Sequence, residues 1–206
     1  MRYAPYRRAD HPRRAILQNR VYAVGRARIL AASFVLLAGL GAWGDARAQG
    51  APQPKSLGVF DAWSAWEHGD QAARVCYLSA TPASSQTKPP GVRRGEIRVT
   101  VSHRPGSNAR DEISFQAGYP IKTDRAVGAV VDKTRNFEFS RRSPAAPEMI
   151  WSKDAAADKA MVAAMRGGRE LVFNGTSQRG TTTADVFKLD GFAKALDAAN
   201  KACGLR

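Results

Sequence analysis

The residue in this chain that most resembles a nucleophile is Ser177. It lies in residues 175–180, a glycine-bounded stretch one residue away from the G-x-S-x-G motif that exposes a catalytic serine on a sharp turn. Arg179 stands where the second glycine would be, and residues 181–183 read as a strand, whereas that motif requires a helix. The composition therefore favours a hairpin turn of small polar residues.

A serine triad can still be drawn with His103 and Asp111, and the adjacent acids Asp111 and Glu112 form a carboxylate pair. A periplasmic hydrolase that uses Ser177 or an acid pair is therefore the alternative function. Acids beside a turn are more simply explained by solvation, and His103 shares strand parity with apolar residues, as a satisfied edge histidine would. The chain is accordingly expected not to be an enzyme.

Metal and cofactor chemistry find no support in the spacing of ligand-type residues. Of the histidines, His68 and His103 follow the N-terminal segment, and neither falls at a ligand spacing with a cysteine. There is no phosphate-binding glycine motif. No cofactor and no metal are expected.

The two cysteines, Cys76 and Cys203, are expected to form one disulfide. Cys203 continues an apolar stripe at helical spacing, so its side chain is expected to face the core. The other members of the stripe are Phe192, Ala195, Leu196 and Ala199. The bridge would join the last helix to an early strand and would be structural.

The basic residues suggest a further alternative, an electrostatic module that binds polyanions. The formal charge is +14, and removing the nine basic and two acidic residues of 1–48 leaves +7. Specific nucleic-acid recognition is not expected, because the charge is not concentrated in one block. Candidate binding loops contain Ser177, Gln178 and Arg179, and Lys88, Arg93 and Arg94; Arg141 and Arg142 add to the basic set.

Alternating apolar residues predict several short strands, which is typical of a sandwich or barrel. Trp63, Trp66 and Trp151 are expected mainly in the core, with stacking on sugars or bases as the other use. Residues 82–95 are expected to be an exposed, mobile loop. Two helices are predicted, over about 154–166 and 191–203, with Asp154 and Asp190 as their N-caps.

The N-terminal segment predicts export. Its arginine-rich start is followed by an uncharged run over residues 29–40, too short for a membrane span, and by a small-x-small site that predicts cleavage between Ala48 and Gln49. The true start is expected at or near Val21. Residues 49–56 then form a linker and 57–206 a single domain, with no transmembrane segment in the mature chain.

Several stretches follow one another in the order seen in the invasion-associated locus B family, which the chain resembles over about residues 57–204. They are Val75-Cys76-Tyr77, residues 101–105 (VSHRP), residues 114–120 (SFQAGYP), residues 153–166, residues 175–181 and the end of the last helix at residues 201–204. The resemblance implies an immunoglobulin-like β-sandwich that is cysteine-bridged and exported to the periplasm or cell surface. It implies no established enzymatic activity or ligand.

Together these observations predict a mainly β, non-enzymatic module of the bacterial envelope that is periplasmic, with secretion or the cell surface as the alternative locations. Its expected partner is an unidentified protein, glycan or other envelope component. By family resemblance the module is linked to interaction with host cells.

Overall fold

A computed structural model describes residues 53–124 and 127–205. These residues belong to the unit that spans residues 48–206. The expected signal peptide, its cleavage site at Ala48 and Gln49, the alternative start near Val21 and most of the linker over 49–56 lie outside the described residues. No helix in the described part is long and apolar enough to cross a membrane.

The strands of the described residues form one antiparallel sheet in the order β1-β2-β3-β5-β6-β9-β8-β7-β10-β11-β4. Alternating apolar residues build most of them, because successive side chains in a strand point to opposite faces. The strands are β1 (Lys55–Phe60), β2 (Trp63–His68), β3 (Val75–Ala80), β4 (Ser84–Lys88), β5 (Arg98–Arg104), β6 (Ala109–Gln116), β7 (Val127–Val131), β8 (Arg135–Ser140), β9 (Met149–Ser152), β10 (Glu170–Thr176) and β11 (Thr182–Lys188).

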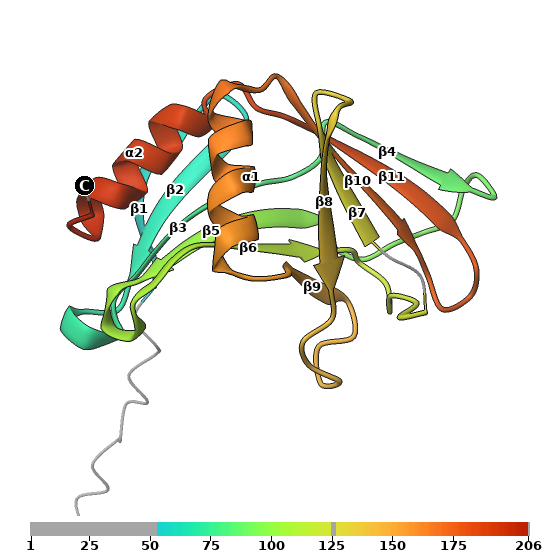
Figure 1. The fold of residues 1–206 in the computed structure, drawn as a ribbon, viewed down its shortest axis with the longest axis horizontal. Helices are drawn as coiled ribbons and strands as arrows, with labels where there is room; N and C mark the ends of the chain where they lie inside the picture. The colour runs from blue at the N-terminus through green and yellow to red at the C-terminus, as the bar shows by residue number, and fades with distance from the viewer. Residues whose placement is uncertain (1–52, 125–126, 206) are drawn as a thin grey trace, which may run out of the picture. The chain divides into compact units, whose positions relative to one another are not determined.

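The sheet folds over so that its two halves face each other across an aromatic core (Figure 1). Phe115 of β6 stacks on Phe173 of β10 with the ring centroids 4.1 Å apart, although three strands separate β6 from β10 in the sheet. Phe187 of β11 meets Phe115 edge to face at 6.2 Å. The mainly β class with two helices is confirmed, and this arrangement is compatible with the expected sandwich.

The helices cover the inner face where the sheet halves diverge. Helix α1 (Ala155–Gly167) begins as predicted, because the Asp154 carboxylate accepts a hydrogen bond from the Ala157 N–H at 2.9 Å. Helix α2 (Phe192–Ala202) packs on β1, β2 and β3, with Phe192 4.9 Å from the Trp63 ring. The prediction that Asp190 is the N-cap of α2 was wrong. The N-cap is Gly191, which has a left-handed conformation with φ of 82°.

A buried acid fastens α1 to the sheet. Asp158 is 3% exposed, and its carboxylate accepts hydrogen bonds from the Ile113 N–H of β6, at 2.8 Å, and from the Ser152 hydroxyl of β9. Ile113 lies just before the three residues of β6 that pair with β9, so the carboxylate occupies the place of a missing strand partner. Burial raises the pKa of Asp158, and these hydrogen bonds partly oppose that rise.

Cys76 of β3 and Cys203, the C-cap of α2, form a disulfide with a Cα–Cα distance of 5.9 Å. Both cysteines are buried, so Cys203 faces the core as the helical stripe predicted. The bridge joins residues that are 127 positions apart in the sequence. It ties the C-terminal end of α2 to the sheet half that α2 covers.

Two boundary predictions were wrong. Residues 82–95 are not a loop throughout, because residues 84–88 form β4, which pairs with β11 at the edge of the sheet. The serine-rich composition hid this strand, since an edge strand with a solvated side needs few apolar residues. Residues 55 and 56 belong to β1 and not to the linker.

Candidate functional site

The structure brings the two predicted binding loops together in one hollow of about 350 Å³, here named the arginine cleft. Arg93 and Arg94 come from the segment before β5, and Ser177, Gln178 and Arg179 come from the β10–β11 turn. The other lining residues are Val92, Gly118, Tyr119, Pro120, Glu148, Thr181 and Thr183. Residues far apart in the sequence therefore meet at one end of the folded sheet.

A close backbone contact fixes the first wall of the cleft. The Gly95 N–H donates to the Gly118 carbonyl at 2.8 Å. Gly118 has φ of +71°, and a Cβ there would lie 2.6 Å from the Gly95 carbonyl oxygen. A glycine is therefore required at position 118 both for its backbone conformation and for the close approach of the segment that carries Arg93 and Arg94.

Arg94 is part of the scaffold of the cleft and not a free ligand-binding group. Its side chain is 6% exposed and forms a two-pronged ion pair with Asp185 of β11, which is 0% exposed, at 2.6 and 2.7 Å. It also donates to the Ala117 carbonyl, and Asp185 accepts from the Ser85 hydroxyl of β4 at 2.7 Å. The expectation that Arg94 lies in an exposed binding loop is thus corrected.

Tyr119 joins this scaffold from the segment after β6. Its hydroxyl shares a hydrogen bond with the Thr183 hydroxyl at 2.7 Å, and the Arg94 guanidinium lies 4.9 Å from its ring centre. A Cβ on Gly175 would lie 2.6 Å from the Tyr119 hydroxyl, so the glycine makes room for this contact. Burial raises the pKa of Tyr119 above its ordinary value of 10.0, and the Thr183 hydrogen bond and Arg94 partly oppose that rise.

The two remaining arginines of the cleft are free to meet a ligand. Arg93 and Arg179 are exposed, and within residues 53–124 and 127–205 neither has a carboxylate partner. Glu148, also in the lining, has no ion-pair partner among the described residues. Because Arg94 is neutralised by Asp185, the unpaired charges are two positive and one negative. The cleft therefore favours a ligand with a few anionic groups over a densely charged one.

Ser177 closes a turn in this structure. Its hydroxyl accepts a hydrogen bond from the Thr181 N–H at 3.1 Å, and its backbone N–H donates to the Thr181 carbonyl at 2.8 Å. The side chain is 7% exposed. These contacts match the hairpin turn that the sequence favoured over a nucleophile elbow.

His103 and Asp111, the other two residues of the serine triad drawn from the sequence, lie near the disulfide. His103 is cross-strand partner to Cys76, and its Nδ1 accepts a hydrogen bond from the Asp111 N–H at 3.1 Å. β5 pairs with both β3 and β6, so His103 is a central residue and not the edge histidine that was expected. Burial lowers the pKa of His103, whereas the Asp111 carboxylate raises it in part. His103 and Asp111 are thus engaged elsewhere than at Ser177.

Metal ligands do not gather in the part of the chain that the structure covers: no cluster of three or more His, Cys, Asp or Glu side chains is arranged to hold an ion. Arg141 and Arg142 of the predicted basic set also lie outside the cleft. Arg142 pairs with Glu112 at 3.1 Å and lies 5.9 Å from the Trp151 ring, and Arg141 lines a separate hollow.

The tryptophans divide between core and surface. Trp63 is fully buried, and its Nε1 donates to the Lys188 carbonyl at 2.9 Å. Trp66 and Trp151 are half-buried. They lie on the outer face, because their neighbours Ala65 and Ile150 are fully buried on the inner face.

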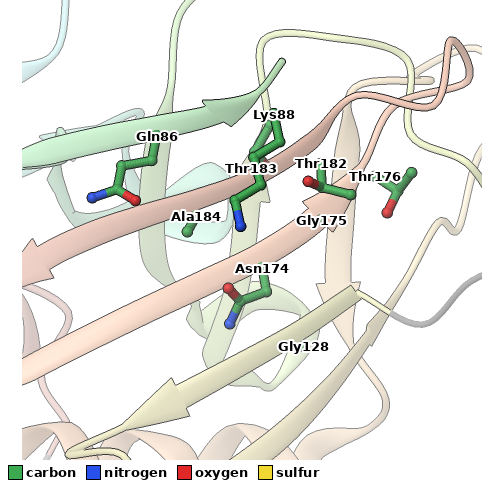
Figure 2. A pocket seen from close by; sticks show the side chains of 9 residues that line it. All are labelled: Gln86, Lys88, Gly128, Asn174, Gly175, Thr176, Thr182, Thr183 and Ala184. Carbon is green, nitrogen blue, oxygen red and sulfur yellow. The ribbon is translucent and has the colours of Figure 1, made fainter. Parts of the chain in front are cut away.

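Lys88 belongs to a second hollow, of about 510 Å³, here named the threonine groove (Figure 2). It lies over β4, β11, β10 and β7. The lining residues are Gln86, Lys88, Gly128, Asn174, Gly175, Thr176, Thr182, Thr183 and Ala184. Thr183 contributes to both linings, but its side chain lies on the inner face of β11 with the cleft, whereas Thr182 and Ala184 of the groove lie on the outer face.

Sequence reasoning missed Tyr119, Glu148 and Thr183 in the lining of the cleft, and Asp185, which lies buried behind it. For Asp185 a signal was present, since it shares strand parity with the buried Thr183 and Phe187 and so had to lie inside. A carboxylate in that position requires a partner. Which arginine supplies it depends on contacts between distant segments, which no local pattern encodes.

Comparison with known proteins identifies relatives of the chain. The model of the invasion associated locus B (IalB) protein family matches residues 63–200. A crystal structure of invasion associated protein b from Bartonella henselae is similar at 17% identity and a TM-score of 0.47, covering 73% of this chain and 98% of that one. No curated protein matches. Because the family model matches more than half of the chain, the protein belongs to the invasion associated locus B family.

Proposed function

We propose that this protein is an exported, non-enzymatic binding module of the bacterial envelope that holds an anionic group of its partner in the arginine cleft. The observation that carries the proposal is the pair Arg93 and Arg179, two exposed guanidinium groups that line one hollow without a carboxylate partner among the described residues. Guanidinium groups bind carboxylates and phosphates through paired hydrogen bonds.

The rigid wall behind these arginines supports the proposal. Arg94, Asp185, Tyr119 and Thr183 bind one another and leave the cleft open. A site that is already formed loses little conformational entropy when a ligand binds, so a few charged contacts are enough. The arrangement suits recognition, and export of the module follows from the N-terminal segment and from the disulfide.

Membership of the invasion associated locus B family supports a role connected with host cells. The name of the Bartonella henselae relative describes it as associated with invasion. We infer that the envelope partner of this module is one used in contact with a host cell or its surface. The arginine cleft is the surface at which that contact would be made.

Chromatography on immobilised heparin, a general anionic probe, tests the cleft. The wild-type protein is expected to elute at a higher salt concentration than the double variant Arg93→Gln/Arg179→Gln, because two ligand contacts are lost. The matched control is Arg135→Gln/Lys153→Gln, which removes the same charge from exposed positions outside the cleft. Equal shifts for both double variants would show that only net charge matters and would refute a cleft-specific role.

The non-enzymatic part of the proposal has its own test. A serine-directed fluorophosphonate probe is expected to leave Ser177 unmodified, because its hydroxyl is buried and accepts the Thr181 N–H. Unfolded protein treated in the same way shows the background labelling. Stoichiometric modification of Ser177 in the folded protein would overturn the assignment as a pure binding module.

A further inference from the structure

A β-bulge near the start of β6 is built around the side chain of His103. The register between β5 and β6 shifts at this point, so that His103 alone lies opposite two residues of β6, Arg110 and Asp111. A bulge of this kind leaves the extra residue without a partner in the strand ladder. Asp111 also has φ of 61°, in the left-handed region that residues other than glycine seldom adopt.

The imidazole supplies the hydrogen-bond partner that the bulge takes away from Asp111. The Asp111 N–H donates to His103 Nδ1 at 3.1 Å. A ring nitrogen that accepts a hydrogen bond carries no proton, so neutral His103 has its proton on Nε2. The ring is fully buried, and Nε2 has no hydrogen-bond partner within the described residues 53–124 and 127–205. The contact at Nδ1 therefore fixes one tautomer of the ring.

A second acceptor for the ring is already in place. Asp111 Oδ1 lies 3.8 Å from His103 Nδ1, which is too far for a hydrogen bond. When Nδ1 gains a proton it becomes a donor and can no longer accept the Asp111 N–H. The carboxylate of the same residue has to move by only about 1 Å to accept the new proton.

Charged groups from each neighbouring element surround the His103 ring. Asp111 and Arg110 of β6 act on its charge directly, and the facing residue of β3 is Cys76, which is held in the disulfide. Further charged groups lie on β2, just before β3 and on the two helices: Glu67, Arg74, Asp158, Lys159, Asp197 and Lys201. In the part of the chain that the structure describes, Asp111 has the one carboxylate within 4.0 Å of a His103 ring nitrogen, at 3.8 Å.

We propose that this bulge is a pH-sensitive switch in which protonation of His103 releases the Asp111 N–H and draws the Asp111 carboxylate onto Nδ1. The proton enters at Nδ1, the bond from the Asp111 N–H breaks, and a bond from Nδ1–H to the carboxylate forms, while the proton on Nε2 stays in place. The inference is independent of the arginine cleft.

The direction of the pH dependence follows from the surroundings of the ring. Burial lowers the pKa of His103, the Asp111 carboxylate raises it in part, and Arg110 lowers it further. The neutral form therefore persists down to the ordinary value of 6.5, and the switch operates below it.

The bulge also forms one wall of a hollow between the two helices. Arg110 and Asp111 line this hollow of about 520 Å³ together with residues of α1 and α2, among them Val162 and Leu196. Release of the Asp111 N–H loosens this wall, and a carboxylate held by the imidazolium contributes less negative charge to the lining. The hollow is thus expected to differ in shape and charge between neutral and acidic solution.

Nuclear magnetic resonance of the mature protein between pH 7.5 and 4.5 tests the switch. The nitrogen-15 shifts of the His103 ring are expected to show a proton on Nε2 alone at pH 7.5 and on both nitrogens in acid. Over the same range the amide-exchange protection factor of Asp111 is expected to fall tenfold or more, while that of Val101 in β5 stays within about twofold.

Variants separate the histidine from the carboxylate. His103→Asn keeps an oxygen that can accept the Asp111 N–H and does not titrate, so the Asp111 amide is expected to stay protected throughout. In Asp111→Asn the loss of protection is expected to move to lower pH, because the imidazolium has lost its acceptor. His68→Asn, which changes a histidine of β2, is the matched control and is expected to behave as the wild type does.

Several outcomes would overturn the switch. They are a proton on Nδ1 at pH 7.5, a His103 ring that stays neutral down to pH 4.5 in the folded protein, and an equal loss of Asp111 protection in His103→Asn. A parallel fall at Val101 would also overturn it, since acid would then unfold the whole domain. The ring and amide measurements need only the wild type, so an unstable variant does not prevent a decision.

Discussion

The disulfide end and the cleft end of the sheet are held by opposite means. At the disulfide end, α2 packs on β1, β2 and β3 through Phe192, Leu196 and other apolar residues. The disulfide holds the C-terminal end of α2 to the sheet. At the cleft end no helix within residues 53–124 and 127–205 packs on β11 or on the edge strand β4 as α2 packs on β1, β2 and β3, and a buried ion pair between Arg94 and Asp185 joins the segments.

The buried titratable groups at the two ends of the sheet also differ. His103, beside the disulfide, is fully buried, and burial lowers its pKa so that it remains neutral. At the cleft end Arg94 is a buried cation, and Asp185 compensates its charge through a two-pronged ion pair. The fold thus stabilises one end of the sheet with apolar cover and leaves polar side chains exposed at the other.

Removal of the disulfide has the largest expected effect on this contrast. Cys76→Ser/Cys203→Ser is expected to lower the free energy of unfolding by up to about 5 kcal/mol, because a long loop is no longer closed in the unfolded chain. Amide exchange is expected to quicken in α2 while β10 and β11 keep their protection. Urea titration of oxidised and reduced wild type is the parallel measurement, and equal midpoints would contradict the prediction.

Removal of one partner of the buried ion pair has the second-largest expected effect on stability. Asp185→Asn leaves the Arg94 charge buried without compensation, and a loss of about 3–5 kcal/mol in unfolding free energy is expected. The control is Asp197→Asn, which breaks the exposed pair with Arg166 and is expected to cost less than about 1 kcal/mol. Similar losses from the two variants would show that the Arg94–Asp185 pair is no special anchor.

The smallest expected effect is a pH dependence at the disulfide end. Since the pKa of His103 is lowered on folding, its contribution to stability is complete above the ordinary value of 6.5 and is lost as the pH falls toward the folded pKa. Below pH 6.5 the slope from this single proton is at most about 1.4 kcal/mol per pH unit.

The measurement is urea unfolding of wild type and His103→Asn between pH 5 and 7.5. The stability difference between the two proteins is expected to shrink as the pH falls, because the variant has no imidazole to protonate. The asparagine side chain keeps an oxygen that can accept the Asp111 N–H. A difference that stays constant over this range would mean that His103 does not change its protonation on unfolding.

Local sequence patterns correctly predicted the features that depend on neighbouring residues, namely a helix cap, a buried helix face and the alternation of two strands. Asp154 caps α1 because its short side chain accepts a hydrogen bond from a free N–H in the first turn of the helix. In α2, the helical spacing of the apolar residues correctly predicted that Cys203 faces the core. The alternation in β5 and β6 predicted their inner faces, where Val99, Val101, Ile113 and Phe115 are buried.

Features that depend on pairing between distant segments were not predictable in this way. β4 is polar and becomes a strand only because β11 offers an open edge. The loops with Arg93 and Ser177 were identified as separate candidates, and only the fold shows that they share a cleft. Arg94 looked like its neighbour Arg93 in the sequence, yet it is buried against Asp185.

The placement of β4 beside β11 has a consequence for how the chain folds. Ser85 and Asp185 are 100 positions apart, Trp63 bonds to a carbonyl 125 positions away, and the disulfide spans 127. Early and late segments are thus interleaved at both ends of the sheet, which gives a high contact order. Neither half of the domain can complete its core alone, so folding is expected to be slow and to proceed as one cooperative step after the last strand is available.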